Sequence, residues 1–97
     1  MFTFFKFDEF KTVIEDVGDY GGAPDYTNIV NTLPKHESCF VFAEYFTHLM
    51  IFAIRLYENS SNQNEVYTIC GDEHKLIANS FDGFISIYKN DINDVFI

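Results

Sequence analysis

A chain of 97 residues makes one domain at most, and its core is small. Its 15 acidic residues against 6 Lys and Arg give a formal net charge of −9. That sign repels phosphate backbones and anionic lipid, so it disfavours binding to nucleic acid or to a membrane surface. It favours a basic protein partner, although charge that only maintains solubility explains it equally well.

The chain is rich in aromatic residues, with 12 Phe and 6 Tyr and no Trp. Large aromatic side chains fill core volume with few residues. A short chain has limited interior for so many rings, so some are expected in a subunit contact. We therefore hypothesise a homodimer or a larger assembly.

The N-terminal segment MFTFFKFDEF is interrupted by charges and lacks a leading basic region, so it does not read as a signal peptide. The longest apolar run of the central stretch, Leu49 to Ile54, is far short of the about 20 residues of a membrane helix. Cys39 and Cys70 lie in apolar runs and make no disulfide framework. The sequence predicts a cytoplasmic protein without a membrane partner.

The first predicted elements are a strand from Phe2 to Phe7 and a helix that ends at Gly18. Asp8 stands where the N-cap of this helix is expected. The helix has one apolar face, formed at helical spacing by Phe10, Val13, Ile14 and Val17.

A long, weakly patterned connection follows from Asp19 to Glu37, with several glycine, proline and asparagine turn signals. Within it, Ile29, Val30 and Leu33 are expected to form one helical turn that packs on the core. Because the connection is long for a compact domain, it is either a functional loop or the remnant of something larger.

The stretch from Ser38 to Tyr57 holds apolar character for longer than any other part of the chain. Residues at both odd and even positions are apolar here, so a strand formed by them has two apolar faces. We therefore predict two strands covered on both faces, with a turn near Phe46-Thr47-His48. Arg55 and Glu44 either form a partly buried pair or face water at the strand edges. We expect the second arrangement, because charges are seldom buried without cause.

Two more strands, from Glu65 to Cys70 and from His74 to Ala78, are expected on either side of a tight turn at Gly71-Asp72-Glu73. Ser80 is expected to cap a final helix. Its apolar face consists of Phe81, Phe84, Ile85 and Tyr88. The predicted fold class is α+β, an antiparallel sheet of about five strands with an N-terminal and a C-terminal helix, in one domain over residues 1–97.

No arrangement of residues points to catalysis, a metal ion or a cofactor. His36, His48 and His74 lack metal-ligand spacing. Cys39 could approach His48 across a hairpin, but burial in an apolar strand raises a thiol pKa and makes it inert. The acidic pairs fall on a helix face, a turn and a tail rather than in a cleft. We therefore expect a protein that is not an enzyme.

The sequence from Ile77 to Phe84 reads Ile-Ala-Asn-Ser-Phe-x-x-Phe and resembles the I-A-x-S-F-x-x-F ending of the SUKH superfamily. The order of strands over Cys39 to Tyr88 is similar as well. The resemblance implies an α+β fold without catalytic residues. Many bacterial members are immunity proteins that bind and neutralise polymorphic toxins, often nucleases.

Members of that family usually begin with helices and a segment ending in Gly-Gly before the sheet. This chain is expected to lack that helical part, because it is too short to hold it in full and Gly21-Gly22 lies in the wrong neighbourhood to replace it.

The first functional hypothesis is an immunity-type protein that docks an acidic face on a basic toxin domain. The alternative is a dimeric structural or regulatory module without a toxin partner. Least favoured is a small enzyme or ligand binder that uses the Asp19 to Glu37 connection as a lid. For the first hypothesis the expected contacts are acids on loops: Asp16, Asp19, Asp25, Glu58, Glu65, Asp72 and Glu73.

Overall fold

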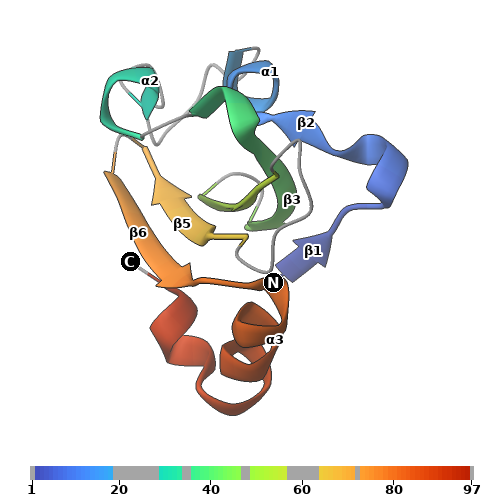
Figure 1. The fold of residues 1–97 in the computed structure, drawn as a ribbon, viewed down its shortest axis with the longest axis vertical. Coiled ribbons are helices and arrows are strands. Elements are labelled where there is room, and N and C mark those ends of the chain that lie inside the picture. The colour runs from blue at the N-terminus through green and yellow to red at the C-terminus, as the bar shows by residue number, and fades with distance from the viewer. Residues whose placement is uncertain are drawn as a thin grey trace.

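The computed structural model describes residues 2–18, 29–33, 36–46, 49–56, 64–71 and 73–96 of the chain. Within these ranges it contains a six-stranded antiparallel sheet between two layers of helix (Figure 1). On one face lie α1 (Val13–Gly18) and α2 (Ile29–Thr32), and on the other lies α3 (Phe81–Asn90). The predicted α+β class, with an antiparallel sheet and a helix near each end of the chain, is confirmed.

The order of the strands is β1-β3-β4-β5-β6, and β2 pairs with the same edge of β3 as β1. Hairpins join β3 to β4 and β5 to β6, and all pairs are antiparallel. The strands are β1 (Phe2–Phe4), β2 (Lys11–Thr12), β3 (Cys39–Tyr45), β4 (Met50–Arg55), β5 (Val66–Cys70) and β6 (Glu73–Ala78).

Each face of the sheet has its own buried cluster, because the central strands carry apolar side chains on both of their faces. The cluster beneath α1 and α2 includes Val13, Ile29, Leu33, Val41, Ile51 and Ile69. The cluster beneath α3 includes Phe42, Phe52, Val66, Phe84 and Val95. The helical turn expected at residues 29–33 therefore packs on the core, as predicted.

The N-terminal segment departs from the expectation of one strand followed directly by a helix. β1 ends at Phe4 rather than Phe7, and α1 begins at Val13. Between them the chain leaves the sheet for a 3-10 turn, η1 (Phe7–Glu9), and returns as β2. The sequence prediction of a helix capped by Asp8 was wrong.

The physical reason is a capping box over Thr12-Val13-Ile14-Glu15. The Glu15 backbone N–H donates to Thr12 Oγ1 at 3.2 Å, and the Thr12 backbone N–H donates to Glu15 Oε1 at 3.0 Å. These reciprocal bonds satisfy two amides that a helix N-terminus leaves free. The helix therefore begins at this motif and not at Asp8.

Replacing Thr12 with alanine is expected to lower the free energy of unfolding by about 1 kcal/mol, because the cap hydroxyl is lost. Serine at the same position retains the hydroxyl and should restore most of that loss. Urea unfolding of the three proteins measures the difference. An alanine variant as stable as the serine variant would show that the capping box does not hold the start of α1.

The same contacts make the stabilisation by the Glu15 carboxylate depend on pH. Its pKa lies below the ordinary 4.5, first because the Thr12 backbone N–H donates to the carboxylate and then because the Thr12 hydroxyl does. Because the pKa is lower in the folded state, the stabilisation is fully present above the pKa of the unfolded state. It is lost as the pH falls through the pKa of the folded state. An NMR titration should show the Glu15 pKa moving upward in the Thr12→Ala variant.

At the other end of the chain the predicted cap is confirmed, since Ser80 Oγ accepts a hydrogen bond from the Gly83 backbone N–H at 3.0 Å. Phe84 is fully buried beneath α3. The 3-10 turn η3 (Ile92–Val95) follows, and the Thr68 hydroxyl donates to the Val95 carbonyl. The C-terminal turn η3 is thereby fixed against β5.

None of the helices in the described ranges has the length and apolar character needed to cross a membrane.

Candidate protein-binding surface

Three of the seven acids predicted as partner contacts fall in the described part of the chain. Asp16 lies on α1, Glu65 lies directly before β5, and Glu73 opens β6 and is exposed. The other four lie outside the described residues: Asp19, Asp25, Glu58 and Asp72.

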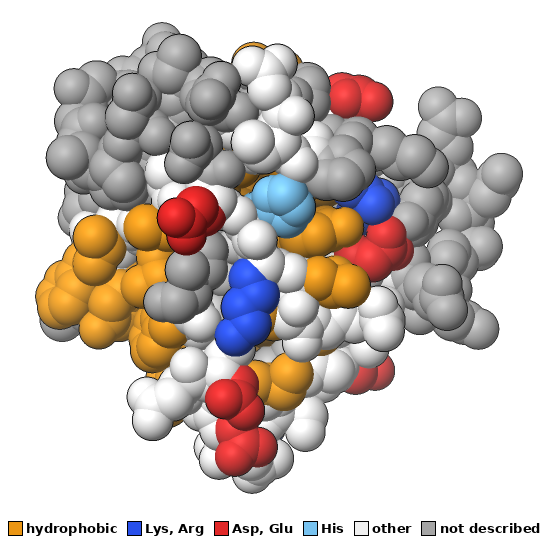
Figure 2. All heavy atoms as spheres, turned by 90° about the vertical axis from the view of Figure 1, so that its left-hand side faces the viewer, with side chains coloured by type: hydrophobic (Ala, Val, Ile, Leu, Met, Phe, Trp, Pro, Cys, Tyr) orange, Lys and Arg blue, Asp and Glu red, His pale blue; other side chains and the backbone are white. Residues whose placement is uncertain are grey.

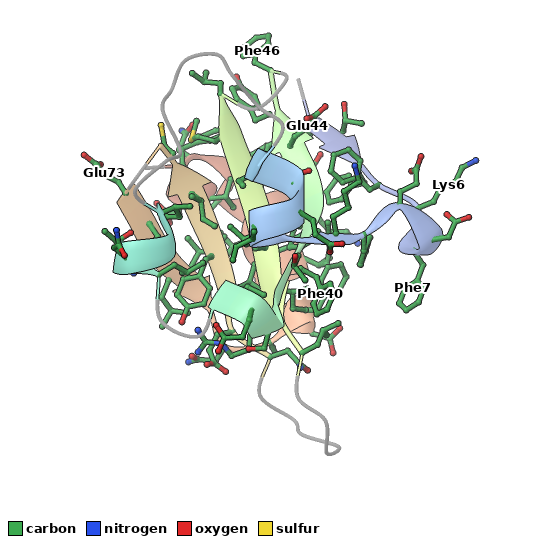
Figure 3. The ribbon with its side chains drawn as sticks, turned by 90° about the horizontal axis from the view of Figure 1, so that it is seen from above. Lys6, Phe7, Phe40, Glu44, Phe46 and Glu73 are labelled. Atoms are coloured by element: carbon green, nitrogen blue, oxygen red, sulfur yellow. The ribbon has the colours of Figure 1, made fainter. Side chains whose placement is uncertain are left out.

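The fold does not gather these three acids on one surface. Glu65 and Glu73 lie at opposite ends of β5, roughly 16 Å apart at about 3.3 Å per residue. Asp16 lies on α1, which packs against β2 and β3 at the other edge of the sheet. In Figure 3, Glu73 and the η1 turn lie on opposite sides of the sheet. The role of these three acids as partner contacts remains a prediction.

Glu65 has a structural partner that the sequence did not reveal. Its Oε2 lies 2.9 Å from Nη1 of Arg55, whose side chain is only 6% exposed. The guanidinium carbon of Arg55 also lies 5.4 Å from the centroid of the Tyr67 ring. The expectation that Arg55 faces water was therefore wrong.

The strand register explains the choice of partner. The Arg55 backbone N–H donates to the Glu65 carbonyl at 2.9 Å, which places the two residues at the same end of the β4–β5 ladder. Glu44, the acid considered in the sequence, instead pairs across the sheet with Ile51, four residues before Arg55.

The described surface carries more acid than base. Four lysines are exposed, namely Lys6, Lys11, Lys75 and Lys89. Twice as many acids are exposed: Asp8, Glu9, Glu15, Glu37, Glu73, Asp82, Asp91 and Asp94. Figure 2 shows acids interspersed with lysine and histidine on the side where β6 lies. The acidity is therefore dispersed over the molecule rather than confined to one loop.

The η1 turn presents a hydrophobic side chain to solvent. Phe7 is 84% exposed, more than any other large hydrophobic side chain described. The turn is held by two bonds of 2.8 Å, from the Glu9 backbone N–H to the Lys6 carbonyl and from the Lys6 backbone N–H to Glu9 Oε1. In Figure 3 Lys6 and Phe7 lie at the outer end of this excursion from the sheet.

A hollow of about 310 Å³ lies beside η1. Its described lining consists of Phe5, Glu9, Lys11 and Asp16. Of the three predicted contact residues in the described ranges, Asp16 lines this hollow. The sequence prediction missed Phe7 by placing it in a strand. The T-x-x-E pattern at residues 12–15 would have revealed it, because a helix starting there leaves residues 6–10 outside any long element.

The described residues contain no group of three His, Cys, Asp or Glu side chains that could hold a metal ion. Cys39 is fully buried, and burial raises the pKa of its thiol, with Arg55 opposing the shift more weakly. Burial also raises the pKa of Cys70. Neither thiol has the lowered pKa of an activated nucleophile.

Cys39 is expected to resist a thiol reagent until the protein unfolds. In a Cys70→Ser variant at about pH 8, modification should be more than about 100-fold slower in the native protein than in urea, because the buried thiol reacts only through opening of the structure. Absorbance of the released thiol-reagent chromophore measures both rates. Equal rates would contradict the burial of Cys39.

Comparisons with protein-family models, curated proteins and solved structures find no match for this chain.

Proposed function

We propose that this chain is a non-catalytic binding protein of the immunity type, which neutralises a bacterial toxin by docking on it. The observation that carries the proposal is the acidic surface, with twice as many exposed acids as exposed lysines in the described ranges and a net charge of −9 overall. A nuclease toxin has a basic groove for nucleic acid. An acidic protein competes for that groove and associates rapidly through electrostatic steering.

The resemblance of residues 77–84 to the SUKH ending supports the same proposal. These residues span the end of β6 and the start of α3. The α+β architecture agrees with the family's fold class. We place the protein in the cytoplasm, with a basic protein partner and without a cofactor, a nucleic-acid partner or a membrane partner.

The second candidate function is a dimeric structural or regulatory module without a toxin partner. Exposed apolar side chains favour it: Phe7 is 84%, Phe46 60% and Leu76 49% exposed. Single exposed hydrophobic residues are normal on a surface, so this candidate rests on the unusually high exposure of Phe7.

The test is the affinity for each basic toxin domain that the same genome encodes, measured by calorimetry at about 50 mM and about 500 mM salt. Binding should weaken as salt rises. A variant that neutralises four exposed acids should bind at least about tenfold more weakly at low salt, since rim charges mainly set the association rate. Its substitutions are Glu73→Gln, Asp82→Asn, Asp91→Asn and Asp94→Asn.

The matched control is Lys89→Gln, which removes an exposed positive charge, makes the protein more acidic and should not weaken binding. Salt-independent binding that the fourfold variant retains would contradict the acidic docking, whereas no binding at either salt concentration would contradict the toxin proposal itself.

A further inference from the structure

We propose that β1 and the C-terminal turn η3 open together as one unit, separately from the rest of the sheet, and that the closed unit covers the edge of β3 at residues 43–45. The inference concerns the fold alone and does not depend on the toxin proposal. Proteins open in contiguous cooperative units whose free energies of opening lie below that of global unfolding. The contacts of residues 2–5 and 91–96 define such a unit.

Polar bonds hold η3 against the last two strands of the sheet. The Thr68 hydroxyl on β5 donates to the Val95 carbonyl, and both residues are fully buried. From β6, Lys75 Nζ lies 3.2 Å from the carbonyl oxygen of Asp94 and 3.2 Å from that of Phe96. Because a buried carbonyl that loses its donor costs free energy, these bonds favour the closed position of η3.

β1 depends on this C-terminal segment for part of its packing. The ring of Phe2 lies 5.8 Å from that of Phe96 and 5.0 Å from that of Tyr88 on α3, centroid to centroid. The Phe96 ring also lies 4.9 Å from the ring of Tyr45, which is opposite Phe2 in the β1–β3 ladder. A strand of three residues is weakly held by main-chain pairing alone. Displacement of η3 with Phe96 therefore weakens the attachment of β1.

The η1 turn allows β1 to leave the sheet while β2 stays. Pairing with β3 stops at Phe5, whose backbone N–H donates to the Phe42 carbonyl at 2.9 Å, and resumes at Lys11. The Phe7 side chain on the turn is 84% exposed, so it contributes little contact that would oppose a rotation of the chain there. Beyond β2, the capping box at residues 12–15 holds the start of α1 by its own bonds. The boundary of the unit therefore lies at η1.

Closure of the unit protects an edge of the sheet. In the closed state the main chain of β1 pairs with residues 43–45 of β3. Opening removes this partner, and an unpaired strand edge is a template for pairing with another chain. The unit is therefore a cover that keeps this edge of β3 from edge-to-edge association.

Native-state amide hydrogen exchange of the Phe5 backbone N–H tests the proposal. Thr68→Val removes the hydroxyl that bonds the Val95 carbonyl, and it should accelerate this exchange at least about tenfold although Thr68 lies on β5. Thr68→Ser retains a hydroxyl and should restore most of the wild-type rate. If circular dichroism shows that Thr68→Val does not fold, Lys75→Met should accelerate the same exchange, because it removes the ammonium group bonded to two carbonyls of the C-terminal segment.

Thr12→Ala is the control for global unfolding, because it removes the cap of α1, on the other side of η1. If the Phe5 amide exchanges only by global unfolding, this variant should accelerate its exchange about fivefold. If the unit opens on its own, the rate should stay unchanged, since the cap is intact in the open state. Acceleration by Thr12→Ala would overturn the proposal. So would a Phe5 exchange rate that the folded Thr68→Val or Lys75→Met variant leaves unchanged, because β1 would then open without η3.

Discussion

Replacing Phe84 with alanine should lower the free energy of unfolding by about 4 kcal/mol, within the range of about 3–5 kcal/mol for removing a buried aromatic ring. Phe84 is fully buried where α3 meets the sheet. Its ring centroid lies 5.2 Å from that of Phe42 and 6.2 Å from that of Phe52. The substitution removes these contacts and leaves a cavity between helix and sheet.

The matched control for this loss is Phe81→Ala in the preceding turn of α3, because Phe81 is 41% exposed and should cost only about 1 kcal/mol. Urea unfolding monitored by circular dichroism measures both. The free energy of unfolding of such domains totals about 5–15 kcal/mol. If the alanine variant at position 84 unfolds, Phe84→Leu should show an intermediate loss. Equal losses at positions 81 and 84 would contradict the placement of α3.

Substitution of Glu65 by glutamine should lower the free energy of unfolding by about 3 kcal/mol, the lower end of the range for breaking a buried ion pair. The reason is that the amide removes the negative charge that balances the guanidinium of Arg55, only 6% exposed. The value lies at the lower end because the Glu65 side chain keeps 19% exposure, where water screens the charge. Chemical denaturation measures it.

Glu73→Gln serves as the comparison, since Glu73 is exposed and its substitution should change stability by less than about 0.5 kcal/mol. Replacing both members of the pair, with Arg55→Met and Glu65→Leu, should destabilise less than Glu65→Gln alone, because no buried charge remains. If Glu65→Gln is as stable as Glu73→Gln, then Glu65 does not hold the β4–β5 end, and its predicted role as a partner contact gains weight.

The central strands and α3 could be predicted from the sequence because their signals are local. Apolar residues at both odd and even positions of β3 and β4 indicate strands covered on both faces, and both faces are buried in the structure. Ser80 and the spacing that includes Phe84 identify the start and the inner face of α3.

The N-terminal segment could not be read in the same way, because its signals compete. Four of the six residues from Phe2 to Phe7 are phenylalanine, and no turn residue marks where β1 ends. Asp8 and Thr12 are both acceptable helix caps, and only the reciprocal bond with Glu15 distinguishes them. The outward position of Phe7 follows from that choice.

The surface was harder to predict than the fold, because it depends on register and on contacts between distant residues. The sequence assigned Glu65 to a loop by its position, whereas its pairing with Arg55 depends on the alignment of β4 with β5. Asp16 reaches the hollow only because β2 returns to the sheet after η1. Sign and loop position alone contain neither relation.

Growth of cells that express a basic toxin domain encoded in the same genome, with and without this chain, tests the immunity proposal most directly. The wild-type protein should restore growth, the fourfold amide variant should restore it less, and Lys89→Gln should restore it fully. Cells that stop growing equally with and without the folded wild-type protein would contradict the account.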